Sequence, residues 1–180
     1  MQELAYLDGC VTQRGKLMLL EGTCHCRSVR FSVRSNEPYP YMYCYCSICR
    51  KTGGGGYAIN LSADATSLEV EGENHLTVYQ ARLDGEDGEG GETSPAKRNF
   101  CSCCGSALWI WDPRWPELLH PFASAIDSVL PKAPERCHIM LDFKPNWVPL
   151  SSGKRDSQFR GYPDQSIHDW HQSRGLISYE

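Results

Sequence analysis

The most chemically informative part of this chain is a group of three cysteines within six residues. We call Cys44, Cys46 and Cys49 the cysteine triplet; Arg50 and Lys51 follow it directly, and then comes a run of four glycines. An extended backbone places the side chains of Cys44 and Cys46 on one face, because side chains alternate along a strand. Cys46 and Cys49 have the C-x-x-C spacing that is typical of zinc sites. The triplet therefore predicts a site for one soft metal ion, to which it offers three ligands.

Two further pairs of cysteines lie on either side of the triplet in the sequence. Cys24 and Cys26 precede it, and Cys101 and Cys104 follow it; we call these four residues the cysteine quartet. A structural zinc ion takes four ligands, whereas a catalytic one takes three from the protein and keeps an open position. The seven cysteines therefore predict two zinc ions, a structural one in the quartet and a catalytic one in the triplet.

Other residues could alter this assignment. Cys103 could replace either cysteine of the second pair, or it could complete the triplet as a fourth ligand. His25 lies between two cysteines but on the opposite side of an extended backbone, which favours a surface or packing role. Cys137 begins an apolar run and is typical of a buried thiol. Cys10 stands alone near the N-terminus, so we expect a free thiol there.

The charge of the triplet indicates what an open zinc site could do. Three thiolates make zinc electron-rich, and such an ion is better suited to binding another soft ligand than to generating hydroxide. A thiol that coordinates it loses its proton, because the metal lowers the thiol pKa. A thiolate held beside an aldehyde is positioned for reversible addition, which gives a hemithioacetal, or for the reverse cleavage. We therefore predict an enzyme that activates a small-molecule thiol toward a carbonyl carbon.

The residues after the triplet are candidates for binding the substrate. Arg50 and Lys51 could bind a carboxylate, or they could offset the negative charge of a zinc ion held by three thiolates. Gly53 and Gly54 would allow the backbone to approach a ligand closely. A flexible turn would explain the same glycines.

Two other functional classes fit the same cysteines. An open zinc site could act as a Lewis acid in the hydrolysis or isomerisation of a small carbonyl or imine substrate, without any thiol. A triplet completed by Cys103 or His25 would instead indicate a non-catalytic binding module that zinc stabilises. The coordination of the second zinc ion, and an assay with and without a small-molecule thiol, would separate the three classes.

Length and composition indicate the number of domains, the class of partner and the cellular compartment. The chain has 180 residues, which fit one domain, and a formal net charge of -4 without a basic block, so a nucleic-acid partner is not expected. It contains no apolar segment of about 18 residues that would span a membrane, and no signal peptide. We predict a cytoplasmic protein, in which the ten cysteines serve as metal ligands or reactive thiols and not as disulfides. The sequence leaves the oligomeric state open.

The pattern of apolar residues predicts a mostly β fold with one short helix late in the chain. Val29, Phe31 and Val33 alternate with polar residues, as in a half-buried strand. Further expected strands are 16–20, 41–43, 57–61, 67–70, 76–81, 97–100, 108–111, 121–124 and 137–143. Residues 84–95 form an acidic loop by composition. A helix begins after Asp164 or Ser166, runs through Ile167 to Gln172 and ends at Gly175. We predict an N-terminal extension (1–15), a zinc-binding catalytic domain (16–150) and a C-terminal tail with the short helix (151–180).

Three cysteine-containing segments resemble one known family. Gly-Thr-Cys-His-Cys at residues 22–26, Tyr-Cys-Tyr-Cys-Ser-Ile-Cys-Arg-Lys-Thr-Gly at 43–53 and Phe-Cys-Ser-Cys-Cys-Gly-Ser at 100–106 are similar to the glutathione-dependent formaldehyde-activating enzymes. The resemblance implies a β-tent-like fold of small antiparallel sheets held by zinc knuckles. It also implies a structural zinc ion in the quartet, a catalytic zinc ion in the triplet, and a carbon–sulfur lyase activity that makes S-hydroxymethylglutathione. Members of the family often carry His where this chain has Tyr45.

Overall fold

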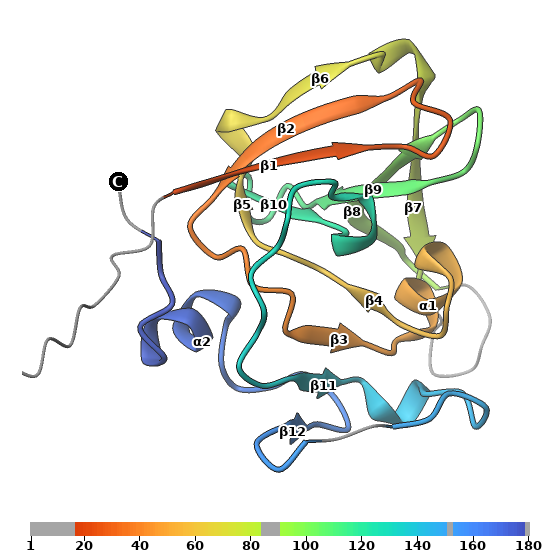
Figure 1. The fold of residues 1–180 in the computed structure, drawn as a ribbon. Helices are drawn as coiled ribbons and strands as arrows, with labels where there is room; N and C mark the ends of the chain where they lie inside the picture. Colours follow the sequence, from red (N-terminus) through yellow and green to blue (C-terminus); the bar gives the residue numbers. More distant parts are fainter. Residues whose placement is uncertain (1–16, 84–90, 151–152, 179–180) are drawn as a thin grey trace, which may run out of the picture.

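The computed structural model describes residues 17–83, 91–150 and 153–178, and these residues form three small sheets (Figure 1). A three-stranded sheet lies at one end of the molecule, a four-stranded sheet lies at the other end, and a five-stranded sheet lies between them. The prediction of a mostly β fold with small sheets and a short C-terminal helix is therefore confirmed. Cys10 and most of the predicted N-terminal extension lie outside the described residues.

The three-stranded sheet is antiparallel and has the order β1-β2-β6. Its strands are β1 (Met18–Thr23), β2 (Arg30–Ser35) and β6 (Glu69–Glu71). Phe31 and Val33 are buried and alternate with partly or fully exposed neighbours, as the sequence pattern predicted. The turn between β1 and β2 carries Cys24 and Cys26, so this sheet delivers one pair of the quartet.

The five-stranded sheet is antiparallel and has the order β5-β10-β9-β8-β7. Its strands are β5 (Ala63–Asp64), β7 (Leu76–Arg82), β8 (Thr93–Cys101), β9 (Ala107–Trp111) and β10 (Leu118–Pro121). Strand β8 begins at Thr93, inside the predicted acidic loop 84–95, because Ser94 and Ala96 bury their side chains. The β8–β9 hairpin places the second cysteine pair at its tip.

The four-stranded sheet has the order β12-β11-β3-β4 and is mixed. Its strands are β3 (Met42–Cys44), β4 (Ala58–Ile59), β11 (Cys137–Ile139) and β12 (Ser157–Gln158). Only β3 and β4 pair antiparallel, whereas β11 runs parallel to both β3 and β12. The expectation of antiparallel pairing thus holds for the first two sheets and not for the third. Long connections join the parallel strands, which is the connection that parallel pairing requires.

The described residues also form two short α-helices, and the sequence predicted only one of them. Helix α2 (Ile167–Ser173) has Ser166 as its N-cap, and the Ser166 side chain accepts a hydrogen bond from the Asp169 N–H, as expected. Helix α1 (Ser47–Gly53) lies inside the cysteine segment, where no helix was predicted. The predicted strands 121–124 and 137–143 are too long, because 3-10 turns at Ala123–Ala125 and Leu141–Phe143 end the extended backbone.

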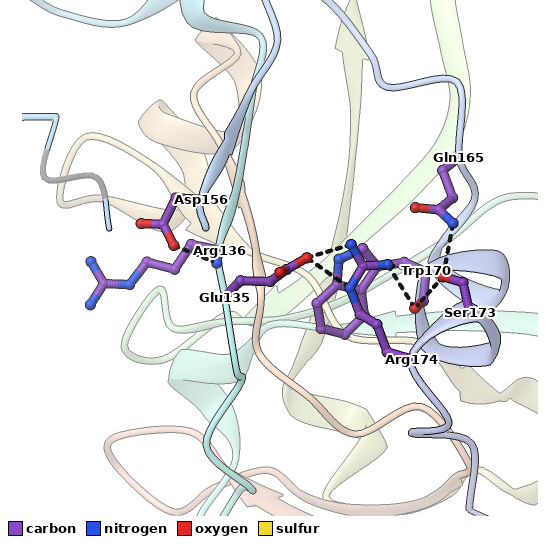
Figure 2. Close-up of polar contacts among 7 residues, drawn as sticks. All are labelled: Glu135, Arg136, Asp156, Gln165, Trp170, Ser173 and Arg174. Atoms are coloured by element: carbon purple, nitrogen blue, oxygen red, sulfur yellow. Dashed lines mark hydrogen bonds and ion pairs between the residues drawn. The ribbon is translucent and has the colours of Figure 1, made fainter. Parts of the chain in front are cut away.

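The C-terminal segment packs against the four-stranded sheet. Trp170 is 3% exposed and stacks on Tyr41, with 3.6 Å between ring centroids and 9° between ring planes. The Arg174 guanidinium lies over the Trp170 ring and forms an ion pair with Glu135 (Figure 2). Strand β12 pairs with β11 through Cys137 and Ser157. These contacts hold the C-terminal segment against the four-stranded sheet, in which β11 is the neighbour of the strand that ends at Cys44. The predicted domain limit at residue 150 stays a prediction.

Helices of the size and composition needed to span a membrane do not occur among the described residues.

Candidate functional site

The quartet unites two hairpins that are far apart in the sequence. The sulfur of Cys26 lies 3.5 Å from that of Cys24 and 3.7 Å from that of Cys101, and all four sulfurs of the quartet lie within 4.8 Å of one another. Tetrahedral zinc with bonds of about 2.3 Å requires sulfurs roughly 3.8 Å apart. The spacing and the all-sulfur donor set therefore fit a closed zinc site.

The turns around the quartet direct hydrogen-bond donors at its sulfurs. The Val29 N–H donates to the Cys24 sulfur over 3.3 Å. Gly105 adopts a φ of 73°, a left-handed conformation that suits glycine, immediately after Cys104. Hydrogen bonds from Ser106 lower the pKa of Cys104 to about 5, so this sulfur is a thiolate near neutral pH. Burial raises the pKa of the Cys101 thiol to about 12. The site therefore combines an accessible thiolate with a buried thiol that a metal ion would deprotonate.

The triplet spans the end of strand β3 and the first turn of helix α1. Cys44 ends the strand, Cys46 is the N-cap of the helix, and Cys49 lies one turn into it. The Cys49 N–H donates to the Cys46 sulfur over 3.3 Å, and the three sulfurs lie within 4.8 Å of one another. The strand-to-helix junction thus brings the three sulfurs together. Their number and spacing fit an open metal site.

The three thiols differ in how readily they ionise, because their sulfurs interact with one another. Hydrogen bonds with Cys44 and then Cys49 lower the pKa of Cys46 to about 2, whereas hydrogen bonds with Cys46 strongly raise the pKa of Cys44. The hydrogen bond with Cys44 and the charge of Arg98 lower the pKa of Cys49, but contact with Cys46 and burial raise it, to about 11 overall. One sulfur therefore carries the charge, and a cation in the site would favour ionisation of the other two.

Three residues that the sequence did not indicate surround the triplet. The Asn60 side-chain amide donates to the Cys49 sulfur over 3.9 Å. Arg98, on strand β8, is buried and close enough to Cys49 to act on its charge. Tyr162 lies near the triplet, since the sulfurs of the triplet add to burial in raising its phenol pKa. These residues are 11 to 113 positions from Cys49, so only the three-dimensional fold reveals their proximity.

The four predicted substrate-binding residues differ in exposure, and only the two glycines line a common cavity. Lys51 is exposed, whereas Arg50 is half-buried and its Nε atom lies inside the protein without a hydrogen-bond partner. Gly53 and Gly54 line a cavity of about 240 Å³ together with Tyr57 and other residues. Gly54 has a φ of 73°, and a Cβ atom at this position would meet no atom within 4 Å. The backbone is therefore accessible there, and a role in substrate binding stays a prediction.

Comparison with known proteins places these cysteines in a known context. Residues 19–141 match the family described as glutathione-dependent formaldehyde-activating enzyme, and this segment contains the whole quartet and the whole triplet. The chain belongs to this family. The sequence resemblance is thus confirmed, whereas Tyr162 and helix α2 lie beyond the matched segment.

Two of the similar proteins illustrate this relationship. A Halomonas elongata protein named "Putative glutathione-dependent formaldehyde-activating enzyme" is 62% identical over 160 residues, which are 88% of this chain and 98% of that protein. A crystal structure of a Rhodobacter sphaeroides protein is 31% identical, with a TM-score of 0.47; the match covers 62% of this chain and 91% of that one.

The residue between the first two triplet cysteines is a buried tyrosine. Tyr45 is 2% exposed, and its hydroxyl lies 3.0 Å from the Nδ1 atom of His138. Burial lowers the pKa of His138, so its imidazole is neutral and can accept the tyrosine proton. The Tyr45 N–H donates to the Ile139 carbonyl over 3.1 Å. Tyr45 therefore attaches the triplet segment to strand β11.

Cys103, Cys137 and His25 lie outside both clusters. The Cys103 sulfur is exposed and lies 3.4 Å from the Nδ1 atom of His75. The His25 N–H donates to the Ser106 hydroxyl, and neither His25 nor Cys103 joins the sulfur groups found among the described residues. Cys137 is 3% exposed, as expected for a buried thiol.

Proposed function

We propose that the protein is a zinc-dependent carbon–sulfur lyase that adds a small-molecule thiol, glutathione or a similar compound, reversibly to an aldehyde carbon. The observation that carries this proposal is the triplet: three convergent sulfurs without a fourth protein ligand among the described residues. The family to which the chain belongs supports formaldehyde and glutathione as the substrates to test first. The quartet would hold a second, structural zinc ion.

The proposed reaction balances without any redox partner. Zinc bound to the triplet would supply an open position in which the substrate thiol is deprotonated. The sulfur forms a bond to the carbonyl carbon, the carbonyl π electrons move to oxygen, and this oxygen takes up a proton. The product with formaldehyde and glutathione is S-hydroxymethylglutathione, and the same steps in reverse cleave the carbon–sulfur bond.

The surrounding residues would hold the triplet in this state. Asn60 donates to the Cys49 sulfur and so limits its basicity. The guanidinium of Arg98 is buried beside the triplet and offsets negative charge from the three thiolates. Tyr45 and its hydrogen bond to His138 fix the backbone from which Cys44 and Cys46 project.

The test is the rate of exchange between labelled formaldehyde and S-hydroxymethylglutathione, measured by NMR above the spontaneous background. We expect the zinc-loaded protein to accelerate exchange in proportion to its concentration. Cys46→Ala should return the rate to background, whereas the matched control Cys103→Ala, which changes a cysteine outside the clusters, should keep it. A wild-type rate equal to background would contradict the proposal for these substrates.

The two other functional classes are outcomes of the same series of experiments. Turnover of a carbonyl or imine substrate that needs no thiol would favour Lewis-acid chemistry at the triplet. A metal ion in the triplet that already has four protein ligands would favour a non-catalytic module.

A further inference from the structure

Arg98 is a buried positive charge without a full set of partners. Its side chain points inward from strand β8 and is 9% exposed. Its Nε and Nη1 atoms are buried and make no hydrogen bond, and the ion pairs found among the described residues do not include it. A buried charge is unfavourable unless an anion or hydrogen-bond acceptors meet it. Cys49 lies close enough to interact with the charge of Arg98, but no described residue accepts a hydrogen bond from the Nε or Nη1 atom, so the guanidinium retains the capacity to bind a further anion.

Arg98 also lines a cavity to which helix α1, the helix that carries Cys49, contributes a residue. The cavity has a volume of about 280 Å³, and its wall includes Arg98, Asn99, Phe122 and Thr52. Thr52 follows Cys49 by three positions on helix α1, so both side chains lie on the same face of the helix. A ligand whose sulfur reaches the triplet could therefore extend into this cavity and meet Arg98.

We propose that Arg98 binds a carboxylate of the thiol substrate in this cavity and so selects thiols that carry one, such as glutathione. A guanidinium forms charge-assisted hydrogen bonds with a carboxylate. Aromatic side chains of Phe100 and Phe122 limit the water around it. The inference rests on the proposed function, because it assumes that the thiol binds at the triplet. Lys51 fits this role less well, since its side chain is exposed.

A purely electrostatic role is the rival explanation. In that case Arg98 would only offset the charge of the three thiolates, and every thiol would depend on it equally. The two explanations differ for a thiol without a free carboxylate.

The test compares two ligands and two variants of the zinc-loaded protein by isothermal titration calorimetry. The ligands are glutathione and its diethyl ester, in which both carboxylates are blocked. The variants are R98M and the matched control K97M, which removes the neighbouring exposed charge that lies over Trp111. We expect R98M to weaken glutathione binding on the order of tenfold to a hundredfold, and to leave binding of the ester within about twofold of wild type. K97M should leave both affinities unchanged.

Other results would overturn the inference. Equal weakening of both ligands in R98M, or unchanged glutathione binding, would assign Arg98 to charge balance or to no role in binding. A loss of thermal stability or of zinc in R98M would instead assign Arg98 a structural role. If wild-type protein bound neither ligand, the proposed function itself would fail, which is a different result from a failure of R98M to discriminate.

Discussion

Replacing Cys104 by Ser tests whether the quartet holds the fold together through a metal ion. Cys104 is exposed, so the exchange of a thiol for a hydroxyl should cost little by itself. Cys103 is the matched control, because it is also exposed and precedes Cys104 directly, but its sulfur contacts His75 and not the quartet. A large difference between Cys104→Ser and Cys103→Ser can therefore arise only through the quartet.

The expected magnitude follows from the length of chain that the quartet closes. Cys26 and Cys101 are 75 positions apart, and closure of a loop of this length costs roughly 4 kcal/mol of chain entropy. Metal binding offsets this entropic cost in the wild-type protein, and the cost is no longer offset when the quartet loses its metal ion. For a domain of this size each kcal/mol shifts the melting temperature by about 2–4 °C, so Cys104→Ser should melt roughly 8–16 °C below wild type.

The assay is thermal unfolding by circular dichroism, together with zinc content by mass spectrometry. We expect Cys104→Ser to lose one zinc ion per chain and to melt earlier, whereas Cys103→Ser should match wild type in both. A chelator should lower the wild-type melting temperature toward that of Cys104→Ser. A Cys104→Ser protein with the wild-type melting temperature and metal content would refute the assignment.

Three further predictions concern residues that support the site. Tyr45→Phe removes the hydrogen bond to the buried His138 and should cost about 1–3 kcal/mol in chemical denaturation while zinc content stays constant; an unchanged denaturation midpoint would contradict this. Trp170→Ala removes the stack on Tyr41 and should lower the free energy of unfolding by about 3–5 kcal/mol, again without loss of zinc. A decrease below about 1 kcal/mol would show that the C-terminal segment contributes little to stability. Burial lowers the pKa of His171 below the unfolded value of about 6.5, so the unfolded chain binds the additional proton and stability falls as the pH drops below about 6.5. His171→Leu should therefore flatten the decline in melting temperature between about pH 7 and pH 5, and an unchanged slope would refute a role of His171 in this decline.

The sequence predicted the cysteine groups because their geometry depends on short-range spacing. The two-residue and three-residue spacings keep the sulfurs of the triplet and of each pair close together within one turn, although Cys24, Cys26 and Cys46 lie outside the strands and only the fold brings the two pairs of the quartet together. Helix α1 was not predicted because its seven residues are too few to show helical periodicity and it ends in the glycine run. Its N-cap is Cys46, which is not one of the residues preferred at that position.

The surroundings of the triplet could not be predicted in the same way. Asn60, Arg98 and Tyr162 come from different elements, and no local pattern relates them to the cysteines. The parallel pairing of β11 with β3 joins segments about 95 positions apart, and tertiary packing rather than local preference sets it. An arginine in a strand is usually exposed, so only the structure reveals that Arg98 is buried.

The most direct test of the central claim is the absorption spectrum of the cobalt-substituted protein during titration with glutathione. If the triplet is an open metal site that binds substrate thiol, the sulfur-to-cobalt charge-transfer bands should intensify and saturate with a stoichiometry of one thiol per chain. Cys46→Ala protein, with cobalt only in the quartet, should show no change. A wild-type spectrum that is indifferent to glutathione and to smaller thiols would contradict thiol activation at the triplet.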